Sequence, residues 1–175
     1  MKKKVLSIVA VVLVLCCAIG GTLAWLTDKT ASVKNTFTVG DINIELTETT
    51  TNYKMVPGNT ISKDPKVTVK ANSEACWLFV KVEKSSNFDS FMTYDMADGW
   101  TALPGVTGVY YREVAATTAA TDFSVLKGDS VSVKDTVTKA DLNALTQNTF
   151  PTLTFTAYAV QKDNVADAAT AWSIR

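Results

Sequence analysis

Apolar and polar residues alternate without interruption from Thr152 to Ala159, and this alternation limits the possible folds more than any other feature of the chain. The apolar members are Leu153, Phe155, Ala157 and Ala159, and the members between them are Thr152, Thr154, Thr156 and Tyr158. Successive side chains of a β-strand point to opposite faces, so the pattern predicts a strand with one buried face and one outer face.

Similar short segments recur along the chain, separated by Gly, Pro, Asn and Asp. The segments predicted as strands are 35–39, 42–46, 66–71, 76–84, 108–114, 130–134 and 152–161. They are rich in threonine and valine, which favour strands, and this number of strands is enough for two sheets. The sequence therefore predicts an all-β fold, an antiparallel β-sandwich, with one or two short helices.

The segment 76–84 shows which of its side chains should face the core. Leu78, Val80 and Val82 share one face, so Lys81 and Glu83 on the other face are expected to meet solvent. Trp77 and Phe79 also fall on the outer face. Either a loop or another subunit covers them, which we favour, or they are exposed aromatics that mark a contact surface.

The alternation changes phase near Gly40. Phe37 and Val39 have one parity, and Ile42, Ile44 and Leu46 have the other. Gly40 could permit a bulge that lets one continuous strand change face. Two separate strands joined by a turn explain the pattern equally well.

Two segments have helical signals. In 137–145, Thr138 is the expected N-cap and Asp141 follows three residues later; in 163–172, Asn164 is the expected cap and Trp172 a possible apolar anchor. The remainder of 87–104, together with 115–122, is interpreted as loop.

The first 24 residues have the organisation of a secretory signal peptide. Lys2, Lys3 and Lys4 precede an apolar run from Val5 to Ile19, and Gly20-Gly21 leads to Thr22-Leu23-Ala24. We predict cleavage between Ala24 and Trp25, which leaves a single β-sandwich domain at 25–175. A retained membrane anchor is the alternative, but the run is shorter than the roughly 20 residues that a spanning helix needs.

Charge and cysteine content limit which partners and which cysteine chemistry can be expected of the exported part. Removing Lys2, Lys3 and Lys4 from 17 basic residues leaves 14 against 17 acidic residues, so no nucleic-acid partner is expected. Cys76 would be the one cysteine left after cleavage. Its apolar surroundings predict a buried, inert thiol rather than a reactive or cross-linking one.

No residue pattern points to catalysis. The chain has no histidine, which excludes Ser-His and Cys-His pairs and HExxH zinc sites, and it has neither GxGxxG nor a P-loop. Asp89, Asp95 and Asp98 lack EF-hand spacing and are interpreted as a solvated loop. No catalytic residue, metal site or cofactor is therefore predicted.

Two N-terminal stretches carry a family resemblance. They are Gly20-Gly21-Thr22-Leu23-Ala24-Trp25-Leu26-Thr27-Asp28 and Asn35-Thr36-Phe37-Thr38-Val39-Gly40-Asp41-Ile42-Asn43-Ile44. They resemble the start of the TasA/camelysin family of Gram-positive bacteria, whose signal peptides are cut by a dedicated SipW-type signal peptidase. Softer similarities lie at Val56-Pro57-Gly58 and at Phe155 to Gln161.

The resemblance implies a jelly-roll sandwich, export, and assembly into fibres of the extracellular matrix or cell surface. In such fibres the N-terminal segment of one subunit completes the sheet of its neighbour. The candidate donor segment is 25–34, and the candidate assembly residues are Trp25, Leu26, Thr27, Asp28, Phe37 and Val39. The expected partners are other copies of the chain and possible further matrix proteins, with the signal peptidase during export and the membrane only transiently, through the signal peptide.

Two other functions compete with the fibre subunit. Camelysin gave the family a metalloprotease label, which we discount because this chain has no histidine and no HExxH helix. The second is a monomeric secreted or surface-held binding module that uses the loops of the sandwich. Self-association separates this module from a fibre subunit.

Overall fold

The computed structural model describes residues 41–49 and 53–175. The chain divides into two compact units, 1–38 and 39–175, and all the described elements belong to the second. Its strands are β1 (Ile44–Thr47), β2 (Thr60–Ser62), β3 (Lys66–Val69), β4 (Cys76–Lys84), β5 (Met92–Thr93), β6 (Thr101–Ala102), β7 (Val109–Val114), β8 (Thr121–Ser124), β9 (Ser130–Val133) and β10 (Leu153–Gln161). Its helices are α2 (Phe88–Phe91), α3 (Lys139–Asn143) and α4 (Ala168–Ile174), with a 3₁₀ turn η1 at Lys127–Asp129.

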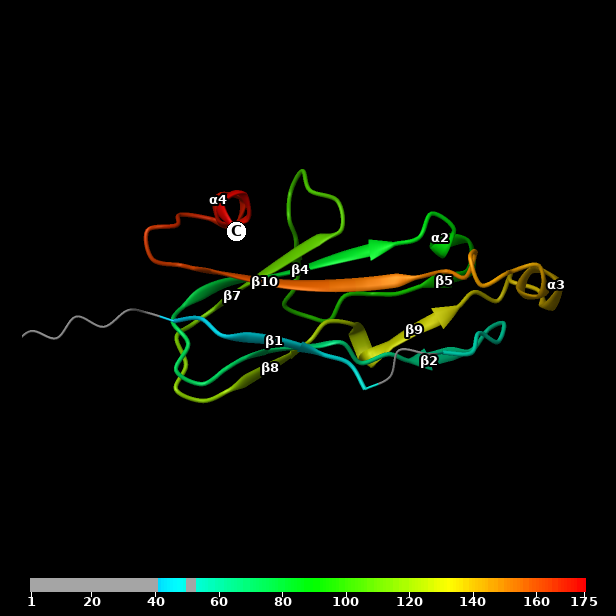
Figure 1. Cartoon of the computed structure of the whole chain (residues 1–175), viewed down its shortest axis with the longest axis horizontal. Helices are drawn as coiled ribbons and strands as arrows, with labels where there is room; N and C mark the ends of the chain where they lie inside the picture. Colours follow the sequence, from blue (N-terminus) through cyan, green and yellow to red (C-terminus); the bar gives the residue numbers. More distant parts are fainter. Residues whose placement is uncertain (1–40, 50–52) are drawn as a thin grey trace, which may run out of the picture. The chain divides into compact units, whose positions relative to one another are not determined.

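The strands form three antiparallel sheets that make two layers (Figure 1). One layer is the sheet β10-β4-β7-β6. The other layer contains two shorter sheets, β1-β3-β8 and β2-β9-β5. This confirms the predicted all-β antiparallel sandwich.

The second layer is divided into two sheets because the chain leaves one sheet for the other at two neighbouring points, between β2 and β3 and between β8 and β9. β2 and β3 are separated by Lys63, Asp64 and Pro65, and β8 and β9 are separated by residues that include η1. The Lys63 N–H donates to the Asp129 carbonyl at 2.8 Å, and the Val125 N–H donates to the Pro65 carbonyl at 2.9 Å. These hydrogen bonds join the connection between β2 and β3 to the connection between β8 and β9.

The core between the layers follows the predicted alternation. Cys76, Leu78, Val80 and Val82 pack with Val67, Val69 and Val125, and Ile44, Leu46, Phe123, Phe155, Ala157 and Ala159 lie against this cluster. A second cluster joins Val131 and Val133 of β9 to Phe88, Met92 and Leu126 under the start of β10. Cys76 is fully buried, as predicted, and burial raises the pKa of its thiol to about 11.

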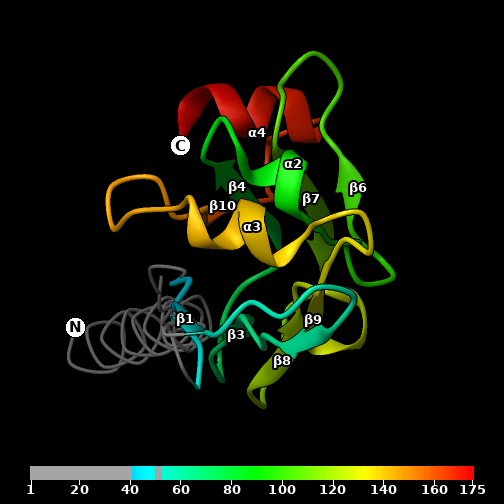
Figure 2. The same cartoon turned by 90° about the vertical axis from the view of Figure 1, so that its right-hand side faces the viewer.

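The outer face of the larger sheet is closed by the chain itself. Trp77 and Phe79 are buried beneath Trp172 of α4, which lies over this face in both views (Figures 1 and 2). The Phe79 and Trp172 ring centroids are 5.3 Å apart, and those of Tyr158 and Trp172 are 5.4 Å apart. Trp77 and Phe79 are therefore covered, as favoured, but the cover is a helix of the same chain and not a loop or another subunit. Lys81 and Glu83 pair at 2.7 Å in solvent, as predicted.

The two predicted helices exist, with one correction. Thr138 caps α3 in a capping box with Asp141, as predicted. Asn164 does not cap α4: its φ is +62°, and Asp167 is the N-cap, because its side chain accepts the Thr170 N–H at 2.8 Å. The helix therefore begins later than predicted, after a turn that contains Asn164.

Several short elements were missed. β2, β5, β6 and α2 were not predicted, and β8 begins within a segment interpreted as loop. The two-residue strands are too short to show a period, and β2 has only one apolar residue, Ile61. The predicted strand 35–39, the phase change at Gly40, the signal segment 1–24 and the donor segment 25–34 lie outside the described residues.

Candidate functional site

The outer edge of β10 is a long strand edge to which no described strand pairs. β10 has nine residues and ends the sheet order β10-β4-β7-β6. The Thr152 carbonyl accepts the Ser85 N–H at 3.0 Å, and the Lys162 N–H donates to the Ala75 carbonyl at 2.9 Å. Because hydrogen-bonded and non-bonded pairs alternate in an antiparallel ladder, the even-numbered residues bond to β4. The N–H and C=O groups of the odd-numbered residues therefore point away from the sheet: Leu153, Phe155, Ala157, Ala159 and Gln161.

The same odd-numbered residues carry the side chains that face the core. Phe155, Ala157 and Ala159 lie against the core cluster between the layers. Residues directly opposite one another on paired strands share a face. A strand added to this edge would therefore direct every second side chain into the space between the layers.

A cavity of about 830 Å³ lies beside the Leu153 end of this edge. Its wall is mostly apolar and comes from the segment after β1, from β2, β5 and β9, from α2 and α3, and from the start of β10. The lining residues are Tyr53, Lys54, Met55, Val56, Ile61, Lys63, Phe88, Met92, Val131, Leu142, Gln147, Phe150, Pro151, Thr152, Leu153 and Thr154. Val56 and Phe150 are 48% and 49% exposed, so large apolar side chains stand open to solvent here.

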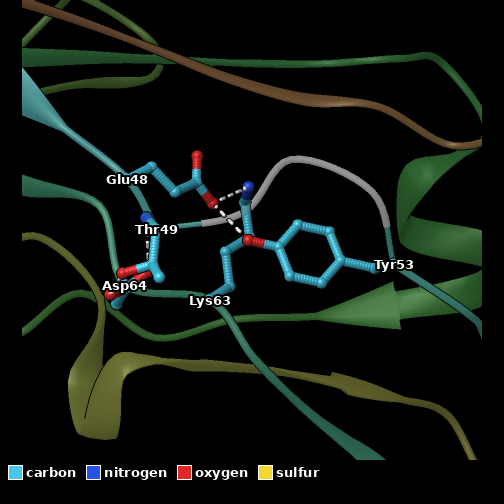
Figure 3. Close-up of polar contacts among 5 residues, drawn as sticks. All are labelled: Glu48, Thr49, Tyr53, Lys63 and Asp64. Carbon is cyan, nitrogen blue, oxygen red and sulfur yellow. Dashed lines mark hydrogen bonds and ion pairs between the residues drawn. The ribbon is translucent and has the colours of Figure 1, made fainter.

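Lys63 and Glu48 form an ion pair at the wall of the cavity (Figure 3). Lys63 Nζ lies 2.5 Å from Glu48 Oε1, and the side chains are only 9% and 18% exposed. Tyr53 Oη donates to the same oxygen at 2.7 Å, and Lys63 Nζ lies 4.9 Å from the centre of the Tyr53 ring. Burial, and then Glu48, raise the pKa of Tyr53 above its ordinary value. The phenol is therefore a stable donor to the carboxylate.

Asp64 holds the end of β1 next to this pair. Its side chain accepts the Thr49 N–H at 3.1 Å and also the Thr49 hydroxyl (Figure 3). These hydrogen bonds lower the pKa of Asp64. Glu48 is thus fixed where β1 stops, opposite the break between β2 and β3.

The pair Lys63–Glu48 was missed, although the sequence contains a signal for it. Lys63 shares its parity with Ile61, Val67 and Val69, and Glu48 continues the parity of Ile44 and Leu46. Extending both alternations by one step would have directed a lysine and a glutamate into the same core. Such a buried pair is expected because an isolated buried charge is costly.

The predicted site residues lie in the part of the chain that the structure does not describe. These are the cleavage residues Ala24 and Trp25 and the assembly residues Trp25, Leu26, Thr27, Asp28, Phe37 and Val39. They remain predictions.

The donor set of this chain does not fit a zinc protease. The sequence has no histidine, and within residues 41–49 and 53–175 no three His, Cys, Asp or Glu side chains gather as metal ligands. Asp89, Asp95 and Asp98 are exposed, and Asp89 pairs with Lys84 at 2.6 Å. A zinc site of the HExxH type needs histidine nitrogens that are not available.

Part of the chain is similar to a known protein family. Residues 1–83 match a family model described as camelysin metallo-endopeptidase. The match reaches into β4 and so includes the start of the described fold. No curated protein and no solved structure matches the chain. Among the described helices, none has the length and apolar character needed to cross a membrane.

Proposed function

We propose, because residues 1–83 match the camelysin family model, that this chain is an exported structural subunit of matrix or surface fibres. Subunits join by strand donation, in which the N-terminal segment of one copy adds to a sheet edge of the next. The free edge of β10 is the observation that carries this proposal. Along its nine residues, the odd-numbered ones direct their backbone groups away from the sheet and their side chains toward the core, and an added strand needs both.

Unpaired strand edges of this length are uncommon in proteins that stay monomeric. Such edges are usually shortened, covered or charged because they pair with other chains. The odd-numbered residues of β10 carry no charge, and no described strand pairs with their outer edge, near which β1 lies. The smaller sheets, by contrast, end in strands of two to four residues.

Export and cleavage supply the timing of assembly in this proposal. Cleavage between Ala24 and Trp25 frees the donor segment 25–34 and the residues that follow it. An uncleaved segment would keep the chain from polymerising before export. Other copies of the chain are the main partners, and further matrix proteins can join through the same edge.

A light-scattering and electron-microscopy experiment tests the assembly. The chain from Trp25 onward is expected to form fibres, and a chain that keeps extra residues before Trp25 is expected to stay small. Equal fibre formation by both would remove the role of cleavage. Persistence of the Trp25 form as a monomer would favour the second candidate, a secreted or surface-held binding module that uses the loops of the sandwich.

The protease activity in the family's description is tested separately. Purified chain is expected to leave casein intact with or without a chelator. Cleavage that a chelator stops would contradict the structural role.

A further inference from the structure

The chain has two arginines, and they lie in different surroundings. Arg175 is exposed; its Nη1 donates to the Trp172 carbonyl, and its Cζ lies 3.2 Å from the centre of the Trp172 ring. Arg112 lies on β7 opposite Leu78, which is fully buried. Residues directly opposite one another on paired strands share a face, so Arg112 projects from the inner face of the larger sheet toward the other layer.

Aromatic rings from both layers pack on the Arg112 guanidinium. Its Cζ lies 4.1 Å from the centre of the Phe123 ring on β8 and 5.3 Å from that of the Trp100 ring, which directly precedes β6. Such cation–π contacts hold a guanidinium in place without using its N–H groups. The contacts with the two layers therefore leave the N–H donors of Arg112 unused.

The surroundings of the guanidinium are fixed by the folded chain. The Trp100 Nε1–H donates to the Ser124 carbonyl at 2.9 Å, and Trp100 is only 9% exposed. Gly99 comes so close that a Cβ at this position would lie 2.8 Å from Arg112 Nη2. Gly99, Trp100 and Phe123 together form the Arg112 niche, and the niche holds the guanidinium in one place.

No hydrogen bond joins the Arg112 side chain to another described residue. Its Nε is buried without an acceptor, and every ion pair in the described part of the chain uses a lysine. Burial lowers the pKa of Arg112, with no contribution from an acidic neighbour. Buried polar groups are almost always hydrogen-bonded, and a charge with neither water nor a partner is costly. An unpaired guanidinium held in this way is therefore suited to an acceptor that the described residues do not supply.

The open part of the guanidinium is its Nη edge. Arg112 is only partly buried, and Nε alone of its side-chain nitrogens is buried without an acceptor. The rings keep water from the rest of the group, which strengthens a hydrogen bond made at this edge. An incoming acceptor would therefore meet Nη1 and Nη2.

We propose that the Nη edge of Arg112 binds a carboxylate from outside the chain. A guanidinium presents parallel N–H groups that match the two oxygens of a carboxylate. Arg112 is the one described cation over the Trp100 and Phe123 rings, and its single charge matches a carboxylate better than a doubly charged phosphate. The site does not depend on strand donation, since β4 separates β7 from β10.

Arginine modification tests the site in the chain from Trp25 onward, which contains the whole described fold. Methylglyoxal labelling followed by peptide mass spectrometry reports on Arg112 and Arg175 separately in one sample. Sodium acetate should slow the labelling of Arg112 by a factor of 1 + [acetate]/Kd, which is about tenfold at about nine times Kd. Arg175 is the internal control and should change little. Sodium chloride at the same ionic strength should protect neither arginine.

Urea unfolding separates a ligand site from a purely structural role. Acetate at about nine times Kd should raise the ratio of folded to unfolded chain about tenfold over chloride. Arg112→Lys keeps the charge but loses the fork of N–H groups and should lose most of this effect. The matched change Arg175→Lys should keep it. A structural contact alone would lower the stability of Arg112→Lys equally in both salts.

A second probe, an acetylated and amidated peptide of four glutamates, identifies the source of the carboxylate. If the ligand is an acidic protein segment, the peptide should protect Arg112 at a lower carboxylate concentration than acetate. If the ligand is a small acid, acetate should protect at least equally well.

Four results would overturn the carboxylate site. They are no protection of Arg112 by either probe, equal protection of Arg112 and Arg175, and an acetate effect on unfolding that survives in Arg112→Lys. The fourth is an Arg112 that methylglyoxal does not label even without acetate, which would show that its Nη edge is closed to small molecules.

Discussion

The outer face and the outer edge of β10 differ in what the chain places against them. Over its outer face, α4 folds back and covers Tyr158 and Val160, together with Trp77 and Phe79 of β4. At its outer edge no described strand pairs with β10, although β1 lies near it, and an apolar cavity stands beside Leu153. A segment of the chain therefore covers the apolar outer face of β10, whereas no described strand completes its outer edge. In the proposed function, the closed face serves stability and the unpaired edge serves contact with another copy of the chain.

The largest effect should come from opening the closed face. Trp172→Ala should lower the free energy of unfolding by about 3–5 kcal/mol, because it removes a buried indole that packs on Phe79 and Tyr158. Urea unfolding followed by circular dichroism measures the loss. Phe150→Ala is the matched change at the open cavity and should cost well under about 1 kcal/mol, because Phe150 is half exposed. An equal decrease in the free energy of unfolding in the two variants would show that the covered face and the open cavity do not differ in their contribution to stability.

The next effect belongs to the polar pair at the cavity wall. Glu48→Gln should cost about 2–3 kcal/mol, slightly less than a fully buried pair, because Lys63 keeps its charge but loses its partner. Adding Lys63→Met to Glu48→Gln should recover most of that loss, as the same unfolding measurement would show. A double variant as unstable as Glu48→Gln alone would mean that the pair does not act through charge.

A smaller effect is expected at α3, on the open side. Thr138→Ala removes the side chain that accepts the Asp141 N–H and should cost about 1 kcal/mol. Lys139→Ala, on the exposed first turn of the same helix, is the control and should be nearly neutral. If both variants unfold at the same urea concentration as the unaltered chain, the Thr138 cap of α3 contributes nothing to the stability of the fold.

The smallest effect is the pH dependence of the cap of α4. Hydrogen bonds from the Thr170 backbone lower the pKa of Asp167 below 3.8 in the folded chain. The charged cap therefore stabilises α4 at any pH above the pKa of Asp167 in the unfolded chain. This contribution is lost as the pH falls through the lower pKa that Asp167 has in the folded chain. Near-ultraviolet circular dichroism of the tryptophans should show the unaltered chain losing more signal in this range than Asp167→Ser, whose cap does not titrate. Identical acid curves would show that the cap does not govern the docking of α4.

The sequence predicted those parts of the fold whose residues alternate over a long stretch. β4 agrees with its predicted bounds, and β10 differs by a single residue, because both strands have one face in the core along their whole length. β5 and β6 could not be found, since two residues define no period. Strand order was also beyond the pattern, because alternation fixes the face of a side chain and not its neighbouring strand.

The candidate site was harder to predict for a different reason. Which edge of a sheet stays open depends on pairing between distant segments, and the cavity is lined by residues from Tyr53 to Thr154. Lys63 and Glu48 were the exception, since each continues an inward-facing alternation. The apolar residues of the N-terminal segment stand out in the sequence, but the acceptor proposed for them depends on the ladder of β10, which the sequence does not show.

The unpaired edge of β10 has a consequence for the geometry of any polymer. In the proposed strand donation, the N-terminal segment of one copy meets the β10 edge of the next, so the contact joins unlike surfaces and does not use one patch twice. Contacts of this kind repeat in a single direction and form a row with two different ends. One end would present an unpaired β10 edge and the other a free N-terminal segment. Growth rates at the two ends would then differ, and a short peptide copying residues 25–34 would block only one of them.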